Sequence, residues 1–277
     1  MISLPQPSAA EDDAYLTALC KNPAWSAHRG AWLIAYTAYR RHGGNPWAVN
    51  PAIFTPDVGV AQRALYDTRK NSRRLKQIRQ TPNLLSCPMC GSPTTGGLDH
   101  YLPRSAYPEF SVMAANLVPA CTHCNSGVKG NTYQGIFPER FIHPYFDTFA
   151  STPLWQIAFR PPHAAVTFRA VPAPGLNAER RSRVAFHLAH VLGSQFSLWA
   201  QNQWATFPQL VRNTIGGTGA VTIMQVAAEA RARLRDARAT TGDNSWSSAF
   251  FRGLSGDAQA QAFIVLAAEP LMATPIV

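Results

Sequence analysis

One stretch decides the fold: residues 87–125 read CPMCGSPTTGGLDHYLPRSAYPEFSVMAANLVPACTHCN. It begins with the pair Cys87 and Cys90 and closes with the pair Cys121 and Cys124, each with the spacing C-x-x-C. Two such pairs are the usual way in which a protein holds one structural zinc ion through four thiolates. The loop between the two pairs is long for a bare zinc ribbon. We therefore expect zinc to fix the two ends of a larger unit.

The loop carries polar side chains that suit phosphodiester hydrolysis. Asp99 and His100 are adjacent, Asn116 follows later, and Asn125 comes directly after the last cysteine. A neutral histidine can activate water as a general base, since its ordinary pKa of about 6.5 leaves it largely uncharged near neutral pH. Aspartate supplies the oxygen ligand that Mg²⁺ prefers, and a divalent cation offsets the phosphate charge. Neighbours on a strand point to opposite faces, so Asp99 and His100 need a bend, or must approach one site from two sides.

Three segments within and just beyond this stretch resemble the HNH endonuclease family. They are LDHYLPRS at 98–105, NLVPAC at 116–121 and CNSGVKG at 124–130. The resemblance covers about residues 85–132. It implies a ββα-metal finger, which is a β-hairpin followed by a helix around one catalytic Mg²⁺ or Mn²⁺ ion, with structural Zn²⁺ on the four cysteines.

The resemblance gives each polar residue of the loop a role. His100 is the general base that acts on water, and Asp99 is a ligand of the catalytic ion. Asn116 braces the hairpin and orients the base. Asn125 stands at the third signature position, where it is a catalytic residue and a metal ligand, so the chain is an H-N-N variant. Lys129, one helical turn later, is expected to face a phosphate.

The charge of the chain favours a polyanionic partner. It has 25 Lys+Arg against 15 Asp+Glu, a formal net charge of +10. Nucleic acid is the commonest such partner, although a soluble protein can also be basic without one. Residues 68–79 contain six basic side chains and no acid: Arg69, Lys70, Arg73, Arg74, Lys76 and Arg79. We assign Arg73, Arg74, Lys76 and the loop residue Arg104 to nucleic-acid binding; the alternative is an ordinary solvated surface.

Cysteine usage and the N-terminal residues favour a cytoplasmic protein without a membrane partner. Four paired cysteines plus Cys20, which we expect to be a buried thiol, do not resemble a secreted disulfide framework. Acidic residues at 11–13 stand where a signal peptide would need an apolar run. The longest apolar stretch, residues 258–268, is about half as long as a membrane span needs to be.

The pattern along the chain predicts an α+β protein with three regions. Residues 1–83 form a helical region with a basic helix end, and residues 84–150 form the nuclease domain with its zinc knuckles. Residues 151–277 form a mainly helical region with a short hairpin. In the first region the aromatic spacing of residues 32, 36 and 39 predicts a helix. A second helix is expected from about residue 56 to residue 79.

The C-terminal region is expected to begin with strands at 155–159 and 165–168. One helix is expected from about residue 178 past residue 199, with further helix to about residue 212. The apolar stripe from residue 223 to residue 234 predicts another. A last helix should follow the cap formed by Asp243, Asn244 and Ser245.

Two histidines keep alternative interpretations. His123 lies between Cys121 and Cys124 and could replace a cysteine at the zinc ion, or contact phosphate from an exposed knuckle. The segment FIHPYFD at 141–147 predicts first an aromatic clamp that packs the finger against the helical body. His143 would then be structural, with the active site as its alternative place.

The predicted function is that of a metal-dependent HNH endonuclease acting on nucleic acid, with DNA first. Such a mechanism leaves 5′-phosphate and 3′-hydroxyl ends, and a chain with one finger should nick. The motif cluster is also similar to HNH effectors of bacterial anti-phage systems, including those paired with a Septu-type ATPase. This similarity implies antiviral defence and a regulatory ATPase partner. The alternatives are a restriction or mobile-element HNH nuclease, and a catalytically inactive, zinc-stapled nucleic-acid-binding or adaptor protein.

Overall fold

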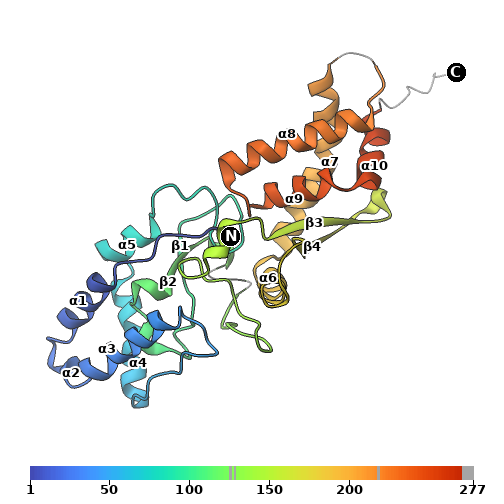
Figure 1. Ribbon diagram of the computed structural model, residues 1–277. Helices are drawn as coiled ribbons and strands as arrows, with labels where there is room; N and C mark the ends of the chain where they lie inside the picture. Colours follow the sequence, from blue (N-terminus) through green and yellow to red (C-terminus); the bar gives the residue numbers. More distant parts are fainter. Residues whose placement is uncertain (125–126, 128, 217–218, 270–277) are drawn as a thin grey trace.

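The computed structural model describes residues 1–124, 127, 129–216 and 219–269. Helices α1–α5 and the hairpin β1–β2 lie at one end of an elongated molecule, and helices α7–α10 lie at the other, with α6 between them (Figure 1). The described residues combine α-helices with two small antiparallel sheets, so the expected α+β class is confirmed.

The N-terminal region is helical, as predicted. Its helices are α1 (Ala9–Leu19), α2 (Pro23–Ser26), α3 (Arg29–Arg41), α4 (Pro56–Arg69) and α5 (Arg73–Arg79). Helix α3 buries Trp32, Tyr36 and Tyr39, which confirms the face predicted from their spacing. The expectation of one helix from residue 56 to residue 79 is wrong. The Ser72 side chain accepts a hydrogen bond from the Leu75 backbone and thereby starts α5 as a separate helix.

The central region contains the β-hairpin that the motif predicts. Strand β1 (Gly97–His100) pairs antiparallel with β2 (Leu117–Ala120), with His100 opposite Leu117. The connection between them includes the 3-10 turns η1 (Pro108–Phe110) and η2 (Ala114–Asn116). Helix α5 packs on this hairpin, because Leu75 forms a small buried cluster with Leu98 and Leu117. The basic helix end is thereby held against the motif.

The C-terminal region begins with turn η4 (Thr148–Ser151) and a second hairpin. Its elements are β3 (Trp155–Arg160), turn η5 (His163–Ala165) and β4 (Thr167–Pro172), then α6 (Ala178–Val191), α7 (Ser194–Ile215), α8 (Ile223–Thr241), α9 (Trp246–Ser255) and α10 (Ala258–Ala268). The helix expected to run past residue 199 is two helices, because the backbone at Leu192 and Gly193 is extended. The predicted cap is confirmed, since Ser245 accepts a hydrogen bond from Ser248 at the start of α9.

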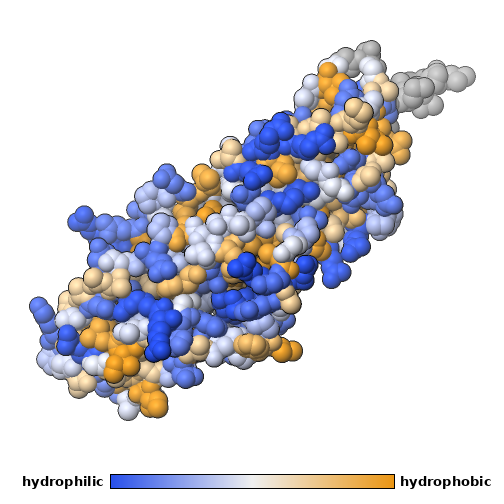
Figure 2. Space-filling view, viewed as in Figure 1, coloured by the Kyte–Doolittle hydropathy of each residue, from blue (hydrophilic) through white to orange (hydrophobic). Residues whose placement is uncertain are grey.

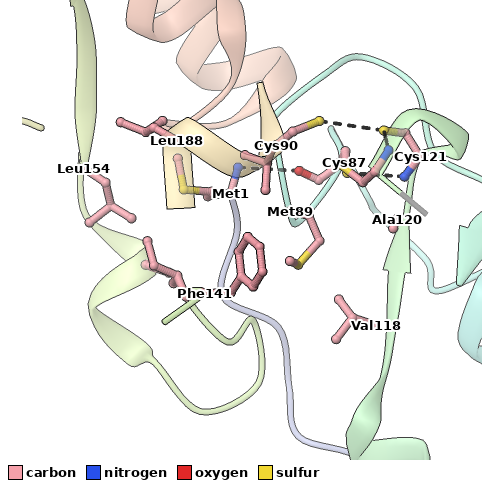
Figure 3. Close-up of a cluster of buried hydrophobic side chains, with 14 of the residues drawn as sticks. Met1, Cys87, Met89, Cys90, Val118, Ala120, Cys121, Phe141, Leu154 and Leu188 are labelled. Carbon is pink, nitrogen blue, oxygen red and sulfur yellow. Dashed lines mark hydrogen bonds between the residues drawn. The ribbon is translucent and has the colours of Figure 1, made fainter. Parts of the chain in front are cut away.

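One hydrophobic cluster connects all three regions. It includes Trp32 from α3, Phe141 from the motif region and Phe250 from α9, and it contains Cys20 as the expected buried thiol. Figure 3 shows part of it, in which Met1 from the N-terminus, Leu154 just before β3 and Leu188 from α6 gather beside the first cysteine pair. Among the described residues, no helix has both the length and the apolar character to cross a membrane.

Candidate metal centre and active site

The four cysteines converge at the Gly97 end of the first hairpin. Their Sγ atoms all lie within 4.8 Å of one another, and all four side chains are buried. The Sγ atoms of Cys90 and Cys121 are 3.7 Å apart; a dashed line marks this contact in Figure 3. Zinc in a tetrahedron of thiolates with bonds of about 2.3 Å separates its sulfurs by about 3.8 Å, whereas a disulfide needs about 2.05 Å. The cluster therefore fits one zinc ion.

Backbone N–H groups donate hydrogen bonds to three of these sulfurs. Cys121 N–H points at Cys87 Sγ (3.3 Å), Ser92 N–H at Cys90 Sγ (3.4 Å) and Cys124 N–H at Cys121 Sγ (3.4 Å). Donors of this kind stabilise the thiolate form that zinc requires. Hydrogen bonds from the thiols of Cys124 and Cys87 hold the pKa of Cys121 well below its ordinary value. His123 is not part of the four-cysteine cluster, so nothing in the described residues supports its role as a replacement ligand.

The first residue of helix α9 is hydrogen-bonded to the first knuckle, residues 87–91. Trp246 donates its backbone N–H to the Gly91 carbonyl (3.0 Å) and its indole N–H to the Cys90 carbonyl (2.8 Å). Gly91 has a φ of +79°, and a Cβ there would approach the Asn244 carbonyl oxygen to 2.3 Å. Only glycine permits both this backbone conformation and this close approach. No local sequence signal linked Gly91 to Trp246, which is far away along the chain.

Asp99 and His100 end strand β1, and Lys129 joins them. Asp99 is 5% exposed, and its Oδ2 lies 3.1 Å from the Lys129 Nζ. Lys129 also donates to the His100 carbonyl (2.8 Å) and is only 1% exposed. Burial raises the pKa of Asp99, and the Lys129 ammonium offsets part of that rise. The resemblance implied that Lys129 faces a phosphate. In the structure its ammonium lies instead against the buried Asp99 carboxylate, and a buried carboxylate needs a nearby positive charge.

The imidazole of His100 is fixed in one orientation. Its Nε2 lies 2.9 Å from the Ser111 carbonyl oxygen, and the ring meets the Tyr66 ring edge-on at 4.6 Å. A carbonyl oxygen can only accept, so Nε2 carries the proton and Nδ1 carries the lone pair. Burial lowers the pKa of His100 to about 4, so the ring is neutral at pH 7. Nδ1 is therefore the atom that can accept a proton.

Asn116 closes the loop that supports His100. The Asn116 side chain is fully buried, and its Oδ1 accepts from Leu102 N–H (2.8 Å). Its Nδ2 donates to the carbonyls of Leu102 (3.0 Å) and Phe110 (3.2 Å). Leu102 follows shortly after His100, and Phe110 precedes Ser111, so Asn116 holds both segments that orient the imidazole. These are the contacts expected of a residue that braces the hairpin. Asn125, the other expected asparagine, lies outside the described residues.

Arg74 differs from the nucleic-acid contact that we expected. It forms an ion pair with the buried Asp12 and donates to the Val112 carbonyl at 2.8 Å. Asp12 also accepts from the backbone of Ala114 (2.8 Å) and Ala115 (3.3 Å). Arg74 is therefore used to neutralise a buried carboxylate that ties α1 and α5 to the loop before Asn116. The charge run gave no signal of this pairing, since Asp12 lies in a different helix.

The other predicted nucleic-acid contacts lie closer to solvent. Arg73 and Lys76 are exposed on α5, where Figure 2 shows a hydrophilic surface. Arg104 is half-buried and bonded to its neighbours, because it pairs with Asp67 (2.7 Å) and donates to the Arg63 carbonyl (3.2 Å). Of the four predicted contacts, Arg73 and Lys76 are therefore more accessible to a nucleic acid than Arg74 and Arg104, which are paired with acidic side chains.

The segment 141–147 packs inside the protein, as the aromatic-clamp interpretation predicts. His143 is fully buried, and its ring lies 3.9 Å from the ring of Tyr101. Asp147 forms two hydrogen bonds with Arg140, at 2.6 and 2.7 Å. Burial alone would raise the pKa of Asp147, but the Arg140 guanidinium holds it below its ordinary value.

Glu109, in turn η1 of the connection between β1 and β2, should make stability depend on pH. It is fully buried; its Oε1 accepts from Ala52 N–H (2.7 Å), and its Oε2 has no hydrogen-bond partner among the described residues. Burial raises the pKa of Glu109 to about 7 from its ordinary 4.5. The folded state then binds the proton more tightly than the unfolded state, so stability falls as pH rises from about 4.5 to about 7.

Glu109→Gln is therefore expected to raise the free energy of unfolding at pH 8, by at most about 3 kcal/mol, and to have little effect at pH 4.5. Urea unfolding at the two pH values measures this. The exposed Glu11, as Glu11→Gln, is the matched control and should give the same small difference at both. An equal effect of Glu109→Gln at both pH values would contradict the assignment.

The described chain is thus a mixed helical and sheet protein with a four-cysteine cluster that could bind zinc. No model of a known protein family matches the chain. No solved structure matches it either. A stretch of 62 residues is 50% identical to protein ea31 of Escherichia phage lambda. The match covers 22% of this chain and 21% of that protein, so the chain matches about a fifth of the relative's length.

Proposed function

We propose that this protein is a metal-dependent endonuclease of the HNH type that hydrolyses phosphodiester bonds of nucleic acid, with DNA as the first candidate. The observation that carries the proposal is the end of strand β1. There, a neutral His100 with its lone pair on Nδ1 directly follows the buried Asp99 in the chain, and Lys129 bonds to the Asp99 carboxylate and to the His100 carbonyl. A proton acceptor and a carboxylate are the two groups that metal-assisted attack by water requires.

The residues fit the divalent ion that such a reaction needs. The buried Asp99 carboxylate, whose Oδ2 lies 3.1 Å from the Lys129 Nζ, is the oxygen donor that the described residues offer to such an ion. Asp99, together with the Asn125 that the motif adds, would hold Mg²⁺ or Mn²⁺, both of which prefer oxygen ligands. When bound, the ion supplies positive charge against the phosphate and the leaving oxygen.

Protein side chains supply the general base and hold it in position. His100 accepts the proton of the attacking water at Nδ1, and the Ser111 carbonyl keeps the imidazole in the required tautomer. Asn116 holds the loop on both sides of this histidine. The four-cysteine cluster closes the opposite end of the hairpin, so the two strands keep their register without a large sheet around them.

A nicking assay tests the proposal. The protein is freed of loosely bound cations, its zinc content is measured, and supercoiled plasmid is then offered with Mg²⁺, Mn²⁺ or neither. We expect nicked circles with Mg²⁺ or Mn²⁺ and none without a cation. Single-stranded DNA and RNA are offered in parallel. Binding of nucleic acid without cleavage of any of the three substrates would instead support the inactive binding protein.

The exposed face of α5 is the expected binding surface for nucleic acid. We expect the double variant Arg73→Ala with Lys76→Ala to weaken DNA binding and to lower the slope of log affinity against log salt by about 2, since each phosphate contact contributes about 0.9. Fluorescence anisotropy at several salt concentrations measures both. Arg160→Ala with Arg169→Ala removes the same charge from exposed positions of the second hairpin and should leave the slope unchanged. Equal losses in both double variants would show a general charge effect.

The place of the enzyme in anti-phage defence, and its regulatory ATPase partner, stay predictions from the motif resemblance. An ATPase gene beside the gene of this protein would support defence, and nicking with and without that ATPase would test the partnership. A neighbouring methyltransferase would instead favour restriction.

A further inference from the structure

Three buried side chains from distant parts of the chain form a continuous hydrogen-bonded series behind the candidate active site. The Tyr39 hydroxyl, on α3, lies 3.0 Å from His143 Nε2 and 3.0 Å from Asn116 Oδ1. All three side chains are fully buried. The series therefore connects segment 141–147 and helix α3 to the residue that closes the catalytic loop.

The direction of each hydrogen bond in this series follows from its neighbours. Leu102 N–H donates to Asn116 Oδ1, so this atom is the amide oxygen and Tyr39 must donate to it. Tyr145 N–H points at His143 Nδ1 (3.2 Å), so that nitrogen carries no proton. In a neutral imidazole the proton is then on Nε2, which donates to the Tyr39 oxygen. This arrangement of protons satisfies all three side chains, and the Tyr39 hydroxyl makes its shorter contact with Asn116 Oδ1, at 3.0 Å, rather than with the Ala115 carbonyl oxygen, at 3.4 Å.

Burial shields the three hydrogen-bonded side chains from solvent and keeps His143 neutral. Burial lowers the pKa of His143 to about 3, so the ring is neutral at physiological pH. The backbone of Gly44, with a φ of +65°, covers the contact: a Cβ there would lie 2.7 Å from the Tyr39 hydroxyl and 2.9 Å from His143 Cδ2. Hydrogen bonds in such a water-free site are strong, and an unpaired member is costly.

We infer that His143 and Tyr39 are positioning residues for the candidate active site, because their hydrogen bonds fix Asn116 and, through it, the loop that orients His100. The inference rests on the proposed endonuclease function. Neither residue touches the substrate or the reacting atoms. Loss of the Tyr39 hydroxyl leaves Asn116 Oδ1 held from one side only and removes the oxygen that lies 3.0 Å from His143 Nε2. Small displacements of a catalytic group lower the rate of reaction strongly.

The chain offers a matched pair of variants on one helix. Tyr39→Phe removes a hydroxyl that makes both contacts, whereas Tyr36→Phe removes a buried hydroxyl without a hydrogen-bond partner among the described residues. We expect Tyr39→Phe to lower the kcat of nicking by about ten- to a hundredfold with little change in the KM for DNA. Tyr36→Phe should change neither. Equal kcat values for Tyr39→Phe and the wild type would overturn the inference.

Two further measurements separate positioning from general stability. The amide of His143→Gln can still donate to Tyr39, so this variant should retain more activity than His143→Leu; equal losses would contradict the inference. Nitrogen-15 NMR of His143 should show a proton on Nε2 and none on Nδ1, and the Nε2 resonance should shift in Tyr39→Phe. A proton on Nδ1 would overturn the hydrogen-bond series, even if the wild-type protein cleaves no nucleic acid and the proposed function itself fails.

Discussion

His100→Ala is expected to lower the rate of plasmid nicking by about 10²- to 10⁴-fold, the usual contribution of a general base. The reason is geometric. The Ser111 carbonyl fixes the proton on Nε2, so the variant removes the Nδ1 lone pair that would accept the proton of water. Asp99 and the hairpin register involve no side-chain atom of His100, so metal binding and fold should persist.

The controls for this variant are a stability measurement and a second histidine. The zinc content of His100→Ala should match the wild type, and the variant should still unfold in one transition above the assay temperature, although it loses the contacts of the imidazole with Ser111 and Tyr66. His123→Ala, in the second knuckle but outside the four-cysteine cluster, should nick at nearly the wild-type rate. If His100→Ala and the wild type nick equally fast, the catalytic role assigned to His100 is wrong and another group must activate water.

Cys121→Ser is expected to abolish zinc binding and to lower the midpoint of thermal unfolding by about 10 °C or more. Cys121 accepts from Cys124 N–H and lies 3.7 Å from Cys90 Sγ, so it holds the two knuckles together. The binding free energy of a structural zinc ion is folding free energy, and the loss of a few kcal/mol shifts the unfolding midpoint by this amount in a chain of this size.

Cys20→Ser provides the matched control for the zinc prediction. Cys20 is also buried and unpaired, but it does not belong to the four-cysteine cluster. Its replacement should leave one zinc ion per chain, as measured by atomic emission or by a colorimetric zinc assay on the unfolded protein. An unchanged zinc content in Cys121→Ser would show that the cluster does not bind the metal through this residue.

Local patterns in the sequence were enough for much of the fold and of the metal centre. The spacing of Trp32, Tyr36 and Tyr39 predicts a buried helix face from geometry within a few residues. The two C-x-x-C pairs predict a cluster although they lie far apart in the chain, because one zinc ion needs four ligands. The pattern does not predict the break between α4 and α5, because apolar and basic residues continue across it while the Ser72 side chain caps the start of a new helix.

The pairings of charged and polar side chains could not be predicted. Lys129 lies against Asp99, and Arg74 lies against Asp12, because each buried carboxylate needs a cation that the folded chain brings from another element. A basic residue in a charge run looks the same in sequence whether it faces solvent or a buried acid. For the same reason the contact between Tyr39 and His143 has no signature in the sequence.

The hydrogen bonds between α9 and the first cysteine pair limit how the motif region, residues 84–150, can be separated from the rest of the protein. A fragment that ends at residue 150 lacks Trp246 and both of its hydrogen bonds to the knuckle carbonyls. It also leaves Phe141 without the α6 side chains that pack against it. The motif region therefore depends on contacts with the C-terminal helices. Its transfer into another protein would require those helices to be transferred as well.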